Sequence, residues 1–157
     1  MNSASGTAPI AMPLEEAWEL LRDLGRARHY VPGLTDVQIT TEQREGVGAS
    51  RRVFSKRGAP MDETVVRWDE GRGFEIRLHR GEAGPPPPFR EARFVYALVP
   101  DGERCRIETT LSWVSRWGVL GKLLDALVMR RAIGRTVQQV ADGLAQHYAQ
   151  VARAGAA

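Results

Sequence analysis

The sequence lacks the residues and the long apolar runs that several classes of protein require. It contains a single cysteine, Cys105, which excludes an internal disulfide bond and a cysteine-based metal site. No stretch approaches the roughly eighteen consecutive apolar residues of a transmembrane helix, so we expect no membrane span. The segment Met1–Ala11 has neither the positive region nor the apolar region of a signal peptide, which favours a cytoplasmic location.

Motifs for phosphate binding, metal binding and nucleophilic catalysis are also missing. The segment Gly46-Val47-Gly48 lacks the further glycine and the lysine of a phosphate-binding loop, and no HExxH zinc motif occurs. The strand–turn–helix signature of a hydrolase nucleophile is absent around Ser112 and Ser115. The histidines have no metal-ligand spacing: His29, His79 and His147. We therefore expect neither a metal nor a cofactor.

Lysine is nearly absent, so arginine supplies most of the positive charge. Only Lys56 and Lys122 are lysines among 22 basic residues, which stand against 19 acidic ones and give a net charge of +3. A nucleic-acid-binding surface requires basic residues gathered on one face, whereas these are scattered among the acids. We interpret the arginine bias as a coding preference and expect no nucleic-acid partner.

The length of 157 residues fits one domain, and its first part predicts two short helices. Met12–Gly25 has proline at the position that begins a helix and apolar residues at helical spacing. A second helix is expected over Arg26–Tyr30, before Pro32 and Gly33 interrupt it. Before them, Ser3–Ile10 predicts only a weak strand.

From Leu34 onward the pattern changes to alternating apolar and polar residues, which is typical of strands that are half buried. Turn residues separate the runs at a spacing of about 8–12 residues, which indicates an antiparallel meander. The expected strands cover residues 34–41, 49–55, 62–68, 74–79, 89–99 and 104–113.

A long amphipathic helix is expected over Gly118–Arg153. Its apolar residues recur at helical spacing: Leu120, Leu123, Leu124, Leu127, Val137, Val140, Ala141, Leu144 and Tyr148. Between Leu127 and Val137 this stripe is interrupted by Arg130 or Arg131 and by Gly134. Two interpretations of Gly134 remain open, namely close packing of a strand or a tryptophan against the helix, or a ligand pocket.

These elements predict an α+β fold, in which a curved antiparallel sheet of about six or seven strands wraps around the C-terminal helix. Two short helices follow the first strand. The inside of such a fold is apolar. Alternation along the strands assigns the following residues to the inner face: Phe74, Ile76, Phe94, Tyr96, Cys105, Ile107, Thr109, Leu111 and Trp113.

Two charged residues share the predicted inner face. If Val53 and Val65 point inward, so do Arg51 and Glu63, which lie two residues away on neighbouring strands. A buried ion pair is costly unless it is well bonded. The pair could hold the sheet together at the mouth of a cavity or serve a ligand. The other strand register places a different set inside: Phe54, Val66 and Trp68.

Five segments, in this order, resemble one superfamily: Ala11–Trp18, Tyr30–Leu34, Gly46–Arg51, Glu63–Asp69 and Gly102–Ile107. Together they are similar to the START-related superfamily, often called SRPBCC, in its polyketide cyclase/dehydrase-like branch. The resemblance implies the helix-grip fold, with a deep cavity between the sheet and the C-terminal helix. It also implies a hydrophobic ligand such as a lipid, a sterol or a polyketide. Members of the superfamily include aromatase-cyclases, carriers and proteins without known chemistry.

Three functions are compatible with this sequence. The first, which we expect, is binding or transport of a hydrophobic small molecule or lipid in a cavity above about 300 Å³. Its predicted lining is Arg51, Glu63, Val65, Phe74, Ile76, Phe94, Tyr96, Thr109, Leu111, Trp113, Leu127, Arg131 and Gly134. The second is a cyclase or dehydratase that uses Glu63, Arg51 and Tyr96. The third is docking on a protein or a membrane through the arginines of the long helix. A homodimer is compatible with each.

Overall fold

The structure is a computed structural model that describes the backbone of residues 1–116 and 125–156, and the side chains of residues 1–116 and 127–156. One antiparallel sheet of seven strands has the order β1-β7-β6-β5-β4-β3-β2. The strands are β1 (Asn2–Ile10), β2 (Leu34–Ile39), β3 (Ser50–Ser55), β4 (Met61–Asp69), β5 (Gly73–His79), β6 (Phe89–Asp101) and β7 (Arg104–Ser115). The helical elements are α1 (Leu14–Leu21), the 3-10 helix η1 (Leu24–His29), the π-helical turn η2 (Asp125–Met129) and α3 (Arg130–Gly155).

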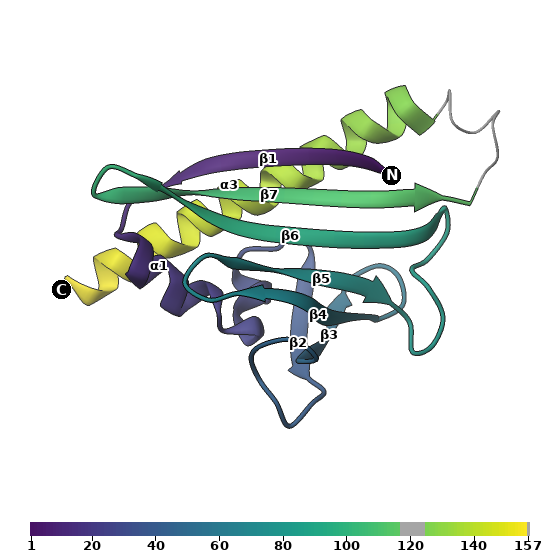
Figure 1. Ribbon diagram of the computed structural model, residues 1–157, viewed down its shortest axis with the longest axis horizontal. Helices are drawn as coiled ribbons and strands as arrows, with labels where there is room; N and C mark the ends of the chain where they lie inside the picture. The colour runs from purple at the N-terminus through teal and green to yellow at the C-terminus, as the bar shows by residue number, and fades with distance from the viewer. Residues whose placement is uncertain (117–124, 157) are drawn as a thin grey trace.

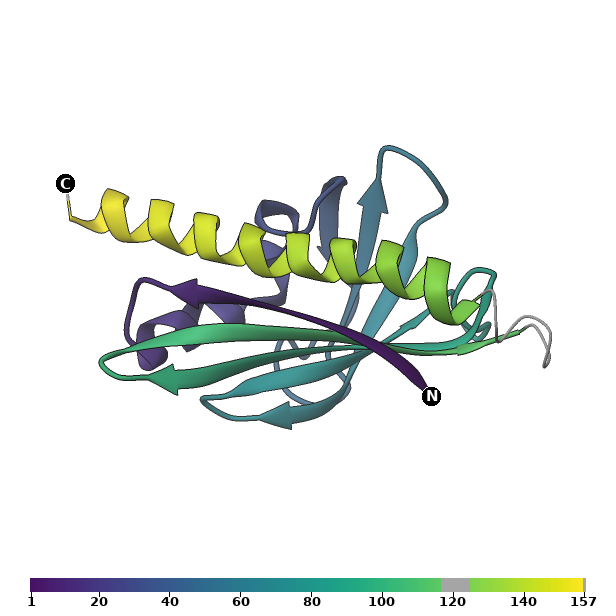
Figure 2. The same ribbon diagram turned by 90° about the horizontal axis from the view of Figure 1, so that it is seen from above.

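The sheet curls around α3, which lies across its concave face (Figure 1). In Figure 2, β1, β6 and β7 pass beneath the helix while β2 and β3 rise beside it. The helix contacts β1, β7 and η1, and its C-terminal end projects beyond the sheet. The predicted helix-grip fold is therefore confirmed. Among the described residues, no helix is long and apolar enough to cross a membrane.

Several predicted boundaries differ from the structure. The first helix is shorter than Met12–Gly25, because η1 begins at Leu24 after the Asp23 side chain accepts a hydrogen bond from the Gly25 amide. The last helix was expected from Gly118, but α3 begins at Arg130 after the π-helical turn. Residues 117–124, which include Leu120, Leu123 and Leu124 of the predicted stripe, lie outside the described residues.

Close contact between β1 and α3 explains why glycine occurs in the first strand. A Cβ added at Gly6 would lie 2.7 Å from the Cα of Gln138, so only glycine fits there without displacing the helix backbone. The Thr7 amide donates to Gln138 Oε1 at 3.1 Å, and Gln138 Nε2 donates to the Thr7 carbonyl at 2.8 Å. The strand that the sequence predicts only weakly, because glycine disfavours strands, is a regular edge strand of nine residues.

A second close contact holds α3 against the end of η1. A Cβ at Gly143 would overlap the carbonyl oxygen of Tyr30. The hydroxyl of Thr109, on β7, donates to the Val137 carbonyl at 3.0 Å. Through these contacts the helix is fixed from Val137 toward its C-terminus, where its inner side chains are buried: Val137, Val140, Ala141, Leu144 and Tyr148.

The strand register places Val53, Val65, Arg51 and Glu63 together on the inner face. Arg51 lies directly opposite Glu63 in the β3–β4 ladder. Part of β4 follows the alternative register, because a bulge between Val65 and Arg67 reverses the alternation of inward and outward side chains. Trp68 therefore also faces the core, opposite Phe74.

Replacing Gly6 by alanine should lower the free energy of unfolding by about 1–3 kcal/mol, because the new methyl group meets helix backbone that cannot rotate away. Urea denaturation measures this change. The control is Ser5→Ala, on the outer face of the same strand, which removes one exposed hydroxyl–hydroxyl contact and should change stability by less than about 0.5 kcal/mol. Equal effects of the two variants would show that the contact with Gln138 is unimportant.

Candidate functional site

The wall of the interior, which is the space between the concave face of the sheet and α3, is largely aromatic. Trp68 stacks on Phe74, with ring centroids 5.6 Å apart, and Phe74 lies 5.1 Å from Tyr96. Phe94 lies 4.7 Å from Tyr96 on the same strand. Alternation along β5 and β6, as the sequence predicts, places these rings on one face.

Toward the end of the interior where α3 begins, partly buried apolar side chains surround a small buried cluster of Ala4, Ala92 and Trp113. Leu78, Leu111 and Ile133 face the core but are only partly buried. A Cβ added at Gly134 would meet no heavy atom within 4 Å. Of the two interpretations of Gly134, close packing of a strand or tryptophan is therefore excluded for the described residues, and open space lies beside the helix.

At the deep end of the interior, Arg51 is held by two hydrogen bonds. Its side chain is 1% exposed, and Nε donates to Glu63 Oε2 at 2.6 Å. Nη1 donates to the carbonyl oxygen of Leu24 at 2.7 Å, which ties β3 to η1. Nη2 is buried and has no hydrogen-bond partner among the described residues. The predicted pairing of Arg51 with Glu63 is thus present, and the remainder of the guanidinium acts on the hydroxyls of Tyr30 and Tyr96.

All three tyrosines of the chain gather at this end of the interior. Tyr30 follows η1, Tyr96 is on β6 and Tyr148 is on α3, and each is buried. The rings of Tyr30 and Tyr96 meet edge to face at 6.0 Å. The hydroxyls of Tyr30 and Tyr148 have no hydrogen-bond partner among the described residues. We call Arg51, Glu63, Tyr30, Tyr96 and Tyr148 the polar cluster.

The polar cluster carries one positive group next to one carboxylate and three neutral phenols. Burial raises the pKa of Tyr30, Tyr96 and Tyr148, although the charge of Arg51 lowers the pKa of the first two in part. Burial alone would lower the pKa of Arg51, but Glu63 together with Tyr30 and Tyr96 outweighs burial and the net pKa is raised. At neutral pH the tyrosines therefore keep their protons, and they can donate hydrogen bonds.

The remaining predicted lining residues fall into three groups. Val65 and Ile76 are buried core residues near the polar cluster. The hydroxyl of Thr109 is already bonded to main-chain carbonyls of β1 and α3, so it is not free for a ligand. Leu127 is 67% exposed and Arg131 is exposed, so the structure does not bring them to the interior.

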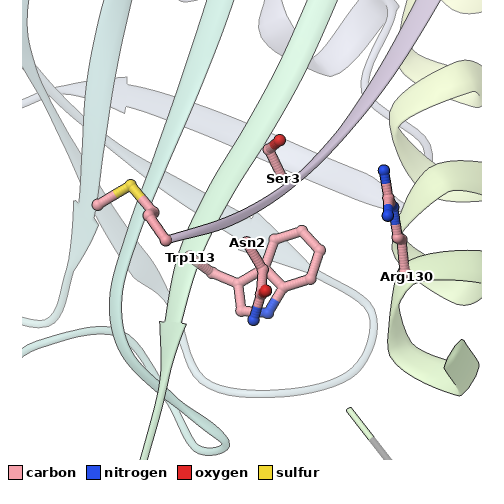
Figure 3. Close-up of a pocket in the computed structure, with 5 residues that line it drawn as sticks. Asn2, Ser3, Trp113 and Arg130 are labelled. Atoms are coloured by element: carbon pink, nitrogen blue, oxygen red, sulfur yellow. The ribbon is translucent and has the colours of Figure 1, made fainter. Parts of the chain in front are cut away.

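Helix geometry explains the placement of Arg131. At about 100° per residue, Arg131 lies roughly 120° around α3 from the centre of the buried stripe, whereas Arg130 is aligned with it. Arg130 is also exposed, and it lines a hollow of about 210 Å³ at the end of the interior, together with Met1, Asn2, Ser3 and the buried Trp113 (Figure 3).

Larger hollows lie outside the predicted lining. One of about 520 Å³ lies between the η1–β2 connection, which includes Tyr30 of the polar cluster, and α3. One of about 540 Å³ lies between α1 and the end of α3, and one of about 310 Å³ lies where α1 and η1 meet Ile39 and Glu45. The connection from β7 to η2, residues 117–124, lies outside the described residues. The volume of the predicted cavity next to that connection therefore stays a prediction.

Tyr30 and Tyr148 are the candidate residues that sequence reasoning missed. Tyr148 stands on the inner stripe of the predicted helix, where a hydroxyl among apolar residues was a usable signal. Tyr30 precedes Pro32 in a bend, and no pattern in the sequence brings it beside Arg51. Among the described residues, no group of histidine, cysteine, aspartate and glutamate side chains is arranged to hold a metal ion.

Replacing Arg51 by methionine should lower the free energy of unfolding by about 3–5 kcal/mol, because Glu63 would be left buried without a counter-charge. Arg52→Met is the matched control, since Arg52 follows in the same strand, its own side chain is half exposed, and its partner Asp62 keeps the hydrogen bond from the Gly81 amide. That change should cost less than about 1 kcal/mol. The double variant Arg51→Met/Glu63→Gln should recover part of the loss in urea denaturation, and the absence of recovery would count against the pair.

Tyrosine titration gives a second test. Tyrosine in an unfolded chain loses its proton near pH 10, and burial raises the pKa of all three in the folded protein. The free energy of unfolding therefore keeps the full contribution of the protonated, buried tyrosines below about pH 10, and this contribution decreases as the pH rises above that value. Urea denaturation between about pH 8 and pH 11 should show this decline, with a smaller slope in Tyr148→Phe. Tyrosinate absorbance near pH 10 in a chain that is still folded would contradict it.

Comparison with known proteins agrees with this geometry. The sequence profile of the family described as polyketide cyclase / dehydrase and lipid transport matches residues 1–149. No functionally curated protein matches the sequence. A protein from Thermus thermophilus is 21% identical, with a TM-score of 0.70 over 96% of this chain and 99% of that chain.

Two further solved structures share the fold. A START superfamily protein from Mycobacterium smegmatis is 15% identical, with a TM-score of 0.73 over 95% of this chain and 98% of that chain. The di-domain ARO/CYC protein BexL, from the BE-7585A biosynthetic pathway, is 14% identical, with a TM-score of 0.71 over 94% of this chain and 46% of that one. Because the profile match extends over nearly the whole sequence, the chain belongs to the polyketide cyclase/dehydrase and lipid transport family.

Proposed function

We propose that the protein binds a hydrophobic small molecule or lipid in the interior, with the apolar part of the molecule against the sheet and α3. The aromatic wall of Phe74, Phe94 and Tyr96 supplies the contact surface. The partly buried side chains near Gly134 supply the approach from outside. The predicted lining residues keep this role, apart from Leu127 and Arg131, whose exposure removes them from it.

The single observation that carries the proposal is the set of unpartnered donors at the deep end of an apolar interior. Buried polar groups in proteins are almost always hydrogen-bonded, and an unpaired one costs about 1–3 kcal/mol. Here the hydroxyls of Tyr30 and Tyr148 lack partners among the described residues, and Arg51 acts on Tyr30 and Tyr96 beside them. A small-molecule site has this composition, with mostly apolar walls and a few convergent polar groups.

Binding fits this arrangement better than cyclase or dehydratase chemistry. A base must accept a proton, whereas the raised pKa of Tyr30, Tyr96 and Tyr148 keeps these groups protonated at neutral pH. Glu63 is engaged by Arg51. His79 bonds to Thr64, and His147 stacks on His29 and lies 5.8 Å from Tyr148, so neither is on the aromatic wall. We therefore propose a carrier or binding protein, acting in the cytoplasm.

Filling the space beside Gly134 tests the proposal. Saturable fluorescence enhancement of diphenylhexatriene, an apolar probe, is expected with the native protein. Gly134→Leu should weaken this binding by about tenfold or more, because the new side chain extends into the open space beside the helix, where we place the approach to the interior. Its helix should be more stable, since leucine favours helices over glycine by ~1 kcal/mol.

The matched control is Gly155→Leu, at the exposed end of the same helix, where an added Cβ also meets no atom within 4 Å. It should leave probe binding unchanged. No enhancement by the native protein would reject the proposed function. Equal weakening by both glycine variants would show that the probe does not bind in the interior.

A further inference from the structure

We propose that the beginning of the C-terminal helix binds the surface of an anionic membrane through Leu127, Val128, Arg131 and Arg135. These four residues are called the docking face. This role goes beyond the proposed function, because it concerns the surface on which the protein acts and not the molecule inside it. Three features support it, namely the exposure of the four side chains, their positions around the helix and the local balance of charge.

Large apolar side chains are exposed just before α3 begins. Leu127 is 67% exposed and Val128 is 65% exposed, whereas the inner apolar side chains of the later helix turns are buried. Four large apolar residues are exposed in the part of the chain that the structure describes, and two of the four are these neighbours. Exposed apolar side chains on a helix can enter the boundary between lipid headgroups and acyl chains.

Two arginines continue this face along the helix. Arg131 follows Leu127 by four residues and Arg135 follows Arg131 by four, so that each lies about one turn beyond the last. At about 100° per residue, Arg131 and Arg135 point roughly 120° and 160° away from the centre of the buried stripe. Both are exposed, and neither forms an ion pair with a described residue. The docking face is therefore directed away from the sheet.

Acidic residues are missing from this stretch of the sequence. Between Asp125 and Asp142 there are three arginines and no aspartate or glutamate. Elsewhere an exposed arginine has a carboxylate beside it, as Arg106 has Glu108 at 3.0 Å. Positive charge without a neighbouring carboxylate complements an anionic surface, and each arginine near an anionic leaflet contributes about a fivefold gain in affinity.

The combination of apolar and basic side chains favours a membrane over nucleic acid or a protein. Phosphates of nucleic acid attract arginines but gain nothing from an exposed leucine and valine beside them. A stable protein interface buries about 800 Å² on each partner, which is more than two apolar side chains and two arginines supply. At a bilayer the apolar side chains enter the headgroup region, while the long arginine side chains keep their charged ends among the lipid phosphates.

The docking face lies at the end of the interior where α3 is least covered. The first turns of α3 lie at the same end of the molecule as the N-terminus and the end of β7 (Figure 2). Gly134, which has open space beside it, stands between Arg131 and Arg135 in the sequence. A protein docked by this face would bring the approach to its interior close to the bilayer.

Cosedimentation with lipid vesicles tests the docking face. The native protein should bind vesicles of equal parts phosphatidylglycerol and phosphatidylcholine, and it should bind pure phosphatidylcholine vesicles about tenfold or more weakly. Raising the salt concentration from about 0.05 M to about 0.5 M should weaken binding to the anionic vesicles. Arg131→Gln/Arg135→Gln should weaken that binding by about tenfold or more, and Leu127→Ser/Val128→Ser by about fivefold or more.

The matched control is Arg153→Gln, near the C-terminal end of the same helix, where the arginine is also exposed and forms no ion pair with a described residue. It should leave vesicle binding unchanged. All the substituted side chains are exposed, so urea denaturation should show that each variant folds.

Three results would overturn the docking face: no binding of the native protein to anionic vesicles, equal binding to neutral and anionic vesicles, or equal losses in Arg153→Gln and in Arg131→Gln/Arg135→Gln. Diphenylhexatriene binding by the same native protein is measured without vesicles. Its failure would reject the proposed function and leave the docking face standing.

Discussion

Close approach of α3 to β1 and to the end of η1 is the constraint on which the rest of the structure depends. Gly6 and Gly143 permit it, since a methyl group at either position would overlap backbone atoms of the neighbouring element. The helix is thereby fixed along its C-terminal part, where its inner side chains are buried. At Gly134 the same residue type has open space instead of a neighbour. One helix is therefore firmly packed at one end of the interior and loosely covered at the other.

The polar cluster is a consequence of this packing. Because α3 reaches η1, Tyr148 lies near Tyr30, and Tyr30 lies near Arg51, which itself bonds to the Leu24 carbonyl of η1. The guanidinium thus joins the sheet to the short helix and acts on the hydroxyls of Tyr30 and Tyr96. Replacement of a buried ion pair by apolar residues often leaves stability unchanged or improves it. The presence of Arg51 and Glu63 is therefore better explained by the elements and groups that they position than by a gain in stability.

Much of this architecture follows from local sequence patterns. Alternation along the strands places Phe74, Phe94 and Tyr96 on the inner face, and a spacing of two residues brings Arg51 and Glu63 there with Val53 and Val65. Periodicity also identifies the buried stripe of the last helix. These predictions succeed because a strand or a helix determines the direction of its own side chains.

Features that depend on contacts distant in sequence could not be predicted in this way. The sequence shows that glycine disfavours a strand at position 6. It does not show that Gly6 fits against the backbone of Gln138, which is far away in the sequence. A bulge turns Trp68 inward against the simple alternation. Tyr30 lies beside Arg51 only because η1 packs against β3. Whether Arg130 or Arg131 is aligned with the buried stripe depends on how α3 is rotated about its own axis relative to the sheet.

The aromatic wall also gives the protein a built-in optical reporter. Trp68 stacks on Phe74, which in turn contacts Tyr96, so an indole lies two ring contacts away from the polar cluster. Trp113 lies near the opposite end of the interior, beside Arg130. An occupant of the interior would change the surroundings of one indole or of the other according to its depth. The chain has four tryptophans, and Trp18 lies 5.1 Å from Trp68. In variants that keep only Trp68 or only Trp113, intrinsic emission therefore reports both whether a molecule is bound and how far it has entered.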